Sequence, residues 1–95
     1  MPITPKNLIR HELCGLRVRI KQSTDPTLRG VQGVVIDETY NMLRLETRKK
    51  EKLVPKKNCV FVFKLPSGER VEVEGKLLVG RPEDRIKKKI PSWFG

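Results

Sequence analysis

The stretch 29–50, RGVQGVVIDETYNMLRLETRKK, combines two glycines, an apolar run, a turn and a second alternating segment. Its first part predicts a strand over 30–38, where the two glycines are typical of a bulge, a sharp bend or a close backbone approach. Residues 40–41 form the predicted hairpin tip, because Asn tolerates a positive φ. The alternation that follows predicts a second strand over 42–49, with its apolar side chains facing inward. The stretch therefore indicates a tight β-hairpin that ends in a cluster of positive charge.

The segments around this hairpin show the same period of two. Residues 16–21, LRVRIK, place apolar side chains on one face and basic side chains on the other. Further strands are expected around 53–54, over 59–66 and over 69–75. Short strands separated by turn signals predict an all-β domain and favour a small antiparallel barrel over an open sheet, because closure protects the strand edges. The side chains predicted to face the core are Leu16, Val18, Ile20, Leu43, Leu45, Thr47, Phe61, Phe63, Val71 and Val73.

Both ends of the chain are predicted to be helical. The single domain over 1–95 would then consist of an N-terminal helix at 4–14, the barrel at 15–80 and a basic C-terminal helix or tail at 81–95. Thr4 is a suitable N-cap for the first helix. The apolar side chains of that helix either cover the domain's own core or face a protein partner, and both interpretations stay open. The candidate partner residues are Leu8, Ile9 and Leu13.

Charge is the strongest functional indication. The chain has 95 residues, with 21 Lys and Arg against 11 Asp and Glu, which gives a net charge of +10. Such an excess in a small domain favours binding to a polyanion, most often nucleic acid, over a merely solvated surface. An anionic membrane is a weaker alternative, since no long basic amphipathic helix is evident. No apolar segment approaches the roughly 20 residues that cross a bilayer, so we expect a soluble, cytoplasmic protein.

The basic residues form three groups: the outward face of the strand at 16–21, the segment after the hairpin, and the C-terminal segment. In a barrel this small the groups could merge into one positive surface that neutralises phosphates and releases counterions. The alternative is that they are separate solvated faces. The predicted RNA-binding residues are Arg17, Arg19 and Lys21; Arg48, Lys49, Lys50, Lys52, Lys56 and Lys57; and Arg81, Arg85, Lys87, Lys88 and Lys89.

The sequence offers little for catalysis or metal binding. Cys14 and Cys59 are far apart in sequence and form no CxxC motif, and His11 is the only histidine, whereas a zinc site needs about four ligands, so we interpret both cysteines as small buried side chains. Asp37 and Glu38 should point to opposite faces of their strand and cannot easily share a metal ion or a proton. We therefore predict no catalytic residues and no metal site. Tyr40 is the candidate for base stacking, but the scarcity of aromatic residues favours recognition of folded RNA by shape and phosphate.

Three runs of the sequence resemble a known family. They are GVQGVVIDETYNMLRLET, VPKKNCVFVFKLPSGERVEVEG and RPEDRIKKK, and the likeness to the archaeal ribonuclease P protein component 1 family extends from about Leu8 to Lys89. The eukaryotic relatives of this family are subunits of nuclear ribonuclease P. The resemblance implies a small Sm-like (SH3-like) antiparallel β-barrel with short N- and C-terminal helices.

The resemblance also implies a set of partners. These are the ribonuclease P RNA, the precursor transfer RNA whose 5′ leader the complex removes, and a zinc-ribbon ribonuclease P protein bound partly through the N-terminal region. Mg²⁺ would be held by the RNA, and the protein itself would bind no cofactor. Two alternatives stay open at this point. One is another RNA-binding barrel, such as a ribosomal protein, and the other is a nuclease that acts through Asp37 or Glu38.

Overall fold

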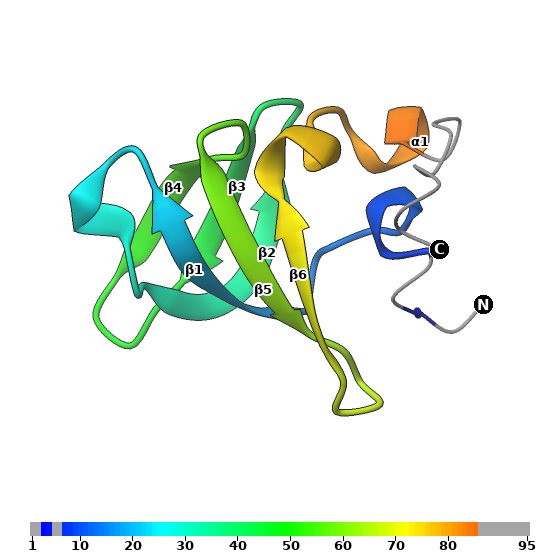
Figure 1. The fold of residues 1–95 in the computed structure, drawn as a ribbon, viewed down its shortest axis with the longest axis horizontal. Coiled ribbons are helices and arrows are strands. Elements are labelled where there is room, and N and C mark those ends of the chain that lie inside the picture. Colours follow the sequence, from blue (N-terminus) through cyan, green and yellow to red (C-terminus); the bar gives the residue numbers. More distant parts are fainter. Residues whose placement is uncertain (1–2, 5–6, 86–95) are drawn as a thin grey trace.

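The structure, a computed structural model, describes residues 3–4 and 7–85 (Figure 1). Within these residues, antiparallel strands form one six-stranded sheet in the order β4-β3-β2-β1-β5-β6. Figure 1 shows the sheet curling around a common interior, and the expected all-β barrel is confirmed. The strands are β1 (Arg17–Ser23), β2 (Gln32–Glu38), β3 (Met42–Glu46), β4 (Glu51–Pro55), β5 (Cys59–Lys64) and β6 (Arg70–Glu74).

Short helices complete the described chain, and none of those within 3–4 and 7–85 is long and apolar enough to span a bilayer. Three are 3₁₀ turns and one is a single α-helical turn. Figure 1 shows η1 and α1 at the same end of the barrel, so the two ends of the described chain meet there. The helices are η1 (Leu8–Arg10), η2 (Pro26–Leu28), η3 (Gly75–Leu78) and α1 (Pro82–Arg85).

The core is formed by the side chains that the alternation places inward. Nine of the ten side chains predicted from the pattern are buried, and the most exposed of these nine, Val71, retains only 9% of its accessible surface, whereas Thr47 is only half-buried. Phe61 and Phe63 lie on the same face of β5 with ring centroids 5.9 Å apart. Burying a side chain of this size stabilises the fold by about 1.5–3 kcal/mol. These two rings therefore hold β5 against the opposite wall of the barrel.

The β2–β3 hairpin has two irregular features, and the close approach at Gly33 is the one that its glycines predict. Its register shifts between Val35 and Asp37, which is a bulge. At Gly33 a Cβ atom would lie less than 3.0 Å from the backbone of Glu46, so the glycine allows the two strands to approach closely. The hairpin tip lies between β2 and β3 as predicted, but Asn41 does not use the positive φ that it tolerates, because every described residue with a positive φ is a glycine.

The N-terminal helix predicted over 4–14 is wrong in extent, since only η1 is helical in the described part of that segment. Thr4 and Asn7 bond reciprocally: the Thr4 amide donates to Asn7 Oδ1 (2.7 Å) and the Asn7 amide donates to Thr4 Oγ1 (3.3 Å). The helix ends at His11, whose backbone is extended with ψ 156°. This early end lets side chains from both sides of His11 enter the interior.

The apolar residues of this segment belong to the domain's own core. Leu8, Ile9 and Leu13 are 0%, 1% and 0% exposed. Their assignment as protein-partner residues is therefore corrected, because a side chain enclosed by its own barrel cannot contact another chain. At the other end, α1 begins at Pro82 as expected. The remainder of the predicted C-terminal helix or tail, over 86–95, lies outside the described residues.

Candidate nucleic-acid interface

The outer face of β1, β5 and β6 carries a row of three cations at one end. Arg17 of β1 lies opposite Lys64 of β5, and Lys64 lies opposite Arg70 of β6. Directly opposed residues of antiparallel strands share a face, with Cβ atoms about 4.5–5.5 Å apart, and like charges in this arrangement repel one another. All three residues are exposed. The row is therefore a place where a bound anion would relieve a repulsion built into the fold.

A shallow hollow of about 630 Å³ adjoins this row, and we call it the basic hollow. It extends from β6 across β5, β1 and β2 to the turn between β3 and β4. Its charged lining combines five cations with one carboxylate, so its net charge is strongly positive. These charged residues are Arg17, Arg19, Glu46, Arg48, Lys64 and Arg70.

The positive charge does not continue along the whole outer face of β1. Lys21, further along the strand, is paired with the Glu72 carboxylate of β6. At the far end of the face, Val60 of β5 lies directly opposite Gln22 of β1 on one side and Glu74 of β6 on the other. Carboxylates therefore interrupt the face beyond Arg19, and the expectation that the basic groups merge into one surface fails along this face.

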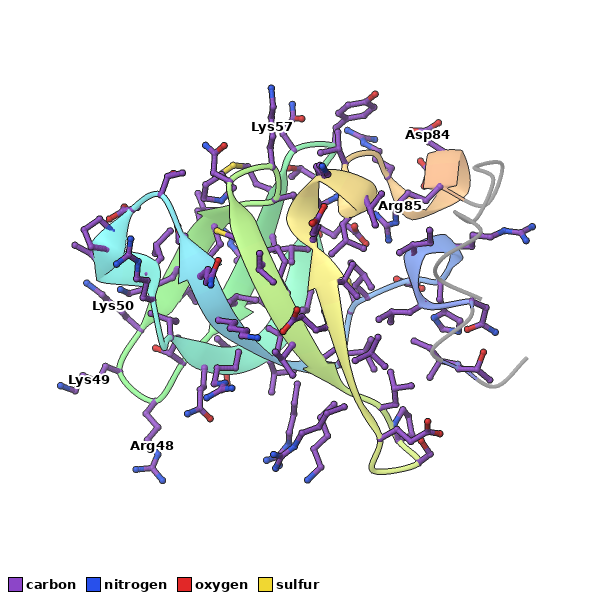
Figure 2. All side chains as sticks on the ribbon, viewed as in Figure 1. Arg48, Lys49, Lys50, Lys57, Asp84 and Arg85 are labelled. Atoms are coloured by element: carbon purple, nitrogen blue, oxygen red, sulfur yellow. The ribbon has the colours of Figure 1, made fainter. Side chains whose placement is uncertain are left out.

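The second predicted group divides between the two ends of β4. Arg48, Lys49 and Lys50 lie in the β3–β4 turn, where Figure 2 shows their side chains extending into solvent. Lys57 follows the opposite end of β4 and points away from the barrel on another side (Figure 2). Lys52 is half-buried on the strand itself. Of this group, Arg48 is the residue that joins the first group in the basic hollow.

Lys56 and Arg85 are corrected from phosphate ligands to internal residues, because both side chains are 0% exposed. They form an ion triad with Glu38, whose side chain is 1% exposed. Lys56 Nζ lies 2.8 Å from Glu38 Oε2 and donates to the carbonyl oxygens of Thr39 (2.7 Å) and Gly80 (2.8 Å). Burying a charge is tolerated only when it is paired and hydrogen-bonded. The triad meets that condition with two cations around one carboxylate.

The Arg85 guanidinium connects both ends of the described chain to β2. It donates to the carbonyl oxygens of Ile9 and His11, each at 2.9 Å, and contacts both carboxylate oxygens of Glu38. The neighbouring Asp37 is exposed, so the two adjacent carboxylates point to opposite faces, as predicted. The Glu38 carboxylate is thus buried in the interior, and Asp37 and Glu38 do not form the shared catalytic site that a nuclease would need.

Two cations of the basic hollow, Lys64 and Arg70, were not among the predicted RNA-binding residues. The alternation contained a signal for both, because Lys64 follows Phe63 and Arg70 precedes Val71 on strands whose apolar residues face inward. The turn at 66–68 then pairs the two strands and sets these cations side by side. Arg81 is exposed, whereas Lys87, Lys88 and Lys89 lie outside the described residues. Tyr40 is 52% exposed at the hairpin tip and does not line the hollow.

The two cysteines differ in exposure. Cys59 is 4% exposed, as expected, but the expectation that Cys14 is buried is wrong. Partial desolvation and then the nearby Glu12 carboxylate raise the pKa of the Cys14 thiol, and burial raises the pKa of the Cys59 thiol. In the part of the chain that the structure describes, no three His, Cys, Asp or Glu side chains gather as metal ligands.

The fold and the hollow together define a class of protein, a small basic β-barrel with a cationic outer face. The family described as ribonuclease P/MRP, subunit p29, matches residues 6–88 of the chain. The chain belongs to this family, as its resemblance in sequence predicted.

Individual relatives agree with this assignment. The chain is 52% identical to ribonuclease P protein component 1 of Methanosphaera stadtmanae, covering 93% of this chain and 95% of the relative. It is 53% identical to the protein of the same name from Methanothermobacter thermautotrophicus, covering 93% and 96%. The solved structure of Mth11, described as a homologue of the human RNase P protein Rpp29, matches with a TM-score of 0.58 at 51% identity. That match covers 80% of this chain and 99% of the Mth11 chain.

Proposed function

We propose that this chain, as a protein subunit of ribonuclease P, binds the catalytic RNA through the basic hollow and leaves bond cleavage to that RNA. The observation that carries the proposal is the row of Arg17, Lys64 and Arg70, in which three cations oppose one another across strands without an intervening carboxylate. Such a row is unfavourable in the free protein and becomes favourable when phosphates lie on it. The complex would act in the cytoplasm, where an archaeal enzyme meets precursor transfer RNA.

The mechanism that we propose is electrostatic. Phosphates from crowded RNA helices repel one another, and Lys and Arg side chains fixed on a rigid sheet neutralise them while releasing counterions. The active RNA fold then costs less free energy, so less Mg²⁺ is required to stabilise it. Mg²⁺ belongs to the RNA in this proposal. The protein supports removal of the 5′ leader from precursor transfer RNA by stabilising the RNA that performs the cleavage.

Two features of the chain support a non-catalytic role. The adjacent carboxylates of Asp37 and Glu38 lie on opposite faces of β2, and Glu38 is enclosed with Lys56 and Arg85. A general acid or base must come within about 2.6–3.2 Å of the proton that it moves, and Glu38 has no access to an external substrate. Neither carboxylate has the surroundings that a hydrolytic pair requires.

We propose that the zinc-ribbon protein of ribonuclease P is the direct partner, but that it binds by a surface other than Leu8, Ile9 and Leu13. Those side chains are internal, whereas Ile36 and Leu53 are 37% and 59% exposed on β2 and β4. Changing Leu53→Asp should weaken co-purification of the partner while leaving the melting temperature unchanged. Equal recovery of the partner with Leu53→Asp would place the interface elsewhere.

The basic hollow is tested by the salt dependence of RNA binding. Replacing Arg17, Lys64 and Arg70 together with Gln should flatten the slope of log affinity against log salt by about 2.7 on duplex RNA, if each phosphate contact contributes about 0.9 as it does on duplex DNA. The same variant should raise the Mg²⁺ midpoint for cleavage of precursor transfer RNA. Lys21→Gln is the matched control, because Glu72 already neutralises that lysine on the same face. An unchanged slope and an unchanged Mg²⁺ midpoint would contradict the proposal.

The β3–β4 turn makes a separate prediction. Replacing Lys49, Lys50 and Lys52 with Ala should flatten the salt slope by about two to three units if each side chain contacts one phosphate. Stability should change by less than about 0.5 kcal/mol at the exposed Lys49 and Lys50, because surface substitutions rarely affect folding, and somewhat more at the half-buried Lys52. If affinity and slope both stay at the wild-type values, these three lysines are solvated and take no part in RNA binding.

A further inference from the structure

We infer that the barrel has a second phosphate-binding site at the opposite end of the β1–β5–β6 face, so that one subunit holds two RNA segments at once. The inference rests on the proposed function, because it takes RNA as the ligand. The site is a hollow of about 650 Å³ that we call the far hollow. The polar and charged residues that line it include Gln22, Arg29, Lys57, Asn58, Glu74 and Lys76.

The far hollow and the basic hollow are separate. They share no lining residue in the described ranges 3–4 and 7–85. Arg17 begins β1 and lines the basic hollow, whereas Ser23 ends β1 and lines the far hollow. At about 3.3 Å per residue, these two ends lie about 20 Å apart. The ion pair of Lys21 with Glu72 lies between them, so a single phosphate group cannot use both hollows.

Two cations in the far hollow are placed to bind a phosphate. The Arg29 Nε–H donates to the Ser23 carbonyl oxygen at 3.1 Å, which fixes the guanidinium beside the end of β1. Within the part of the chain that is described, its terminal N–H groups and the Lys57 ammonium make no hydrogen bond or ion pair. Figure 2 shows the Lys57 side chain extended away from the barrel. A guanidinium fork together with an ammonium is a strong combination for a phosphate oxyanion.

The remaining lining suits a nucleotide better than a bare anion. Gln22 and Asn58 provide amide groups that both donate and accept hydrogen bonds, as ribose hydroxyls and base edges require. Glu74 brings a negative charge, but Lys76 lies 3.2 Å from its carboxylate and offsets it. The volume lies within the range of pockets that hold ligands of nucleotide size. The geometry therefore points to an unpaired nucleotide of an RNA loop or single strand.

The far hollow is built on fixed backbone. A Cβ atom at Gly75 would lie less than 3.0 Å from the Lys56 carbonyl oxygen, so η3 is in close contact with the β4–β5 turn. Ser23 Oγ and Cys59 Sγ lie 3.4 Å apart and join β1 to β5 beneath the hollow. A preformed site loses little conformational entropy on binding, which favours the binding of a single nucleotide.

The test uses two RNA probes: a donor-labelled hairpin for the basic hollow and an acceptor-labelled hexauridylate for the far hollow. The wild-type chain should bring the two labels together in one complex, giving energy transfer and a mass for one protein with both RNAs in native mass spectrometry. Arg29→Gln with Lys57→Gln should weaken hexauridylate binding and lower the energy transfer, while hairpin binding remains at the wild-type level. On hexauridylate this variant should flatten the salt slope by about 1.4, at about 0.7 per contact.

The controls separate this inference from the proposed function. Arg17→Gln with Lys64→Gln should lose the hairpin and retain hexauridylate, and Arg44→Gln, paired with Glu51 outside both hollows, should change neither. Lys57→Gln alone, in an exposed turn, provides a readout if the double variant fails to fold. Retained energy transfer in a folded Arg29→Gln and Lys57→Gln protein would overturn the inference. Binding of polyglutamate as strong as that of hexauridylate would also overturn the inference, because the hollow would then accept any polyanion. If the wild-type protein does not bind the hairpin, the proposed function is refuted as well.

Discussion

Replacing Glu38 with Gln should destabilise the barrel more than any surface substitution. Glu38 is the one carboxylate in the triad, and it stands between Lys56 and Arg85, whose side chains are both 0% exposed. Gln preserves the size of the side chain and one acceptor oxygen, so the change removes mainly the negative charge. Two cations would then remain buried without an anion. Breaking a buried ion pair on one side typically costs about 3–5 kcal/mol.

That cost is a large part of the stability of a domain of this size. At about 0.05–0.15 kcal/mol per residue, a chain of 95 residues has a free energy of unfolding of about 5–14 kcal/mol. For domains of up to about 100 residues, each kcal/mol corresponds to about 4–8 °C in melting temperature. The Glu38→Gln protein should therefore melt about 12–40 °C below the wild type. Thermal unfolding followed by far-ultraviolet circular dichroism measures this directly.

Glu51→Gln is the matched control. It removes the same charge from an ion pair with Arg44, in which Arg44 Nε lies 3.4 Å from Glu51 Oε2 and both side chains are about half exposed. Such an exposed pair contributes about 0–1 kcal/mol, and high salt should reduce that contribution further. The deficit of Glu38→Gln should persist in about 1 M NaCl, because buried charges are screened much less. If the two variants melt within a few degrees of each other, the triad does not stabilise the fold in the way we argue.

Three further predictions address local features. Gly33→Ala should destabilise the protein by about 1–3 kcal/mol in urea denaturation, because the added Cβ meets the backbone of Glu46 rather than a movable side chain. Hydrogen bonds from its own turn lower the pKa of Asp25, so its stabilising effect is complete at neutral pH and is lost as the pH falls through the folded-state pKa. The melting temperatures of the wild type and Asp25→Asn should therefore converge in acid. Iodoacetamide should modify Cys14 in the folded protein and Cys59 only after unfolding, with Cys14 slower than a peptide thiol because its raised pKa leaves less thiolate.

A different result would contradict each of these three predictions. A Gly33→Ala protein as stable as the wild type would show that the hairpin strands separate without cost. A melting-temperature difference between the wild type and Asp25→Asn that is independent of pH would remove the carboxylate from the acid response. Equal rates of modification at both cysteines in the folded state would contradict their different exposure.

The apolar side of this fold could be predicted from sequence because it depends on local alternation. Val18 and Ile20, or Val71 and Val73, are two residues apart, and a strand necessarily places them on one face. The same rule assigns Lys56 to the interior, because it lies two residues after the buried Val54. Because lysine is so rarely buried, its charge predicts an exposed position, but the alternation predicts its place in this fold correctly.

The functional surface was less predictable because it depends on pairing between distant segments. Arg85 and Arg81 have the same chemistry and lie in the same basic segment, yet one is enclosed and the other is exposed. The difference lies in Glu38, 47 positions earlier than Arg85, which local reasoning does not connect to it. The row of cations likewise depends on the register of β1 with β5, and that register is a property of the folded sheet.

The position of Arg85 has a consequence for folding during synthesis. A ribosome makes this residue after all the described strands, yet the carbonyl groups of Ile9 and His11 depend on it for their hydrogen bonds. A nascent chain that has emerged only as far as β6 therefore has every strand of the barrel but not the guanidinium that completes its interior. The last step of folding should wait for that one side chain, and until then the emerging protein would be open to proteases and chaperones.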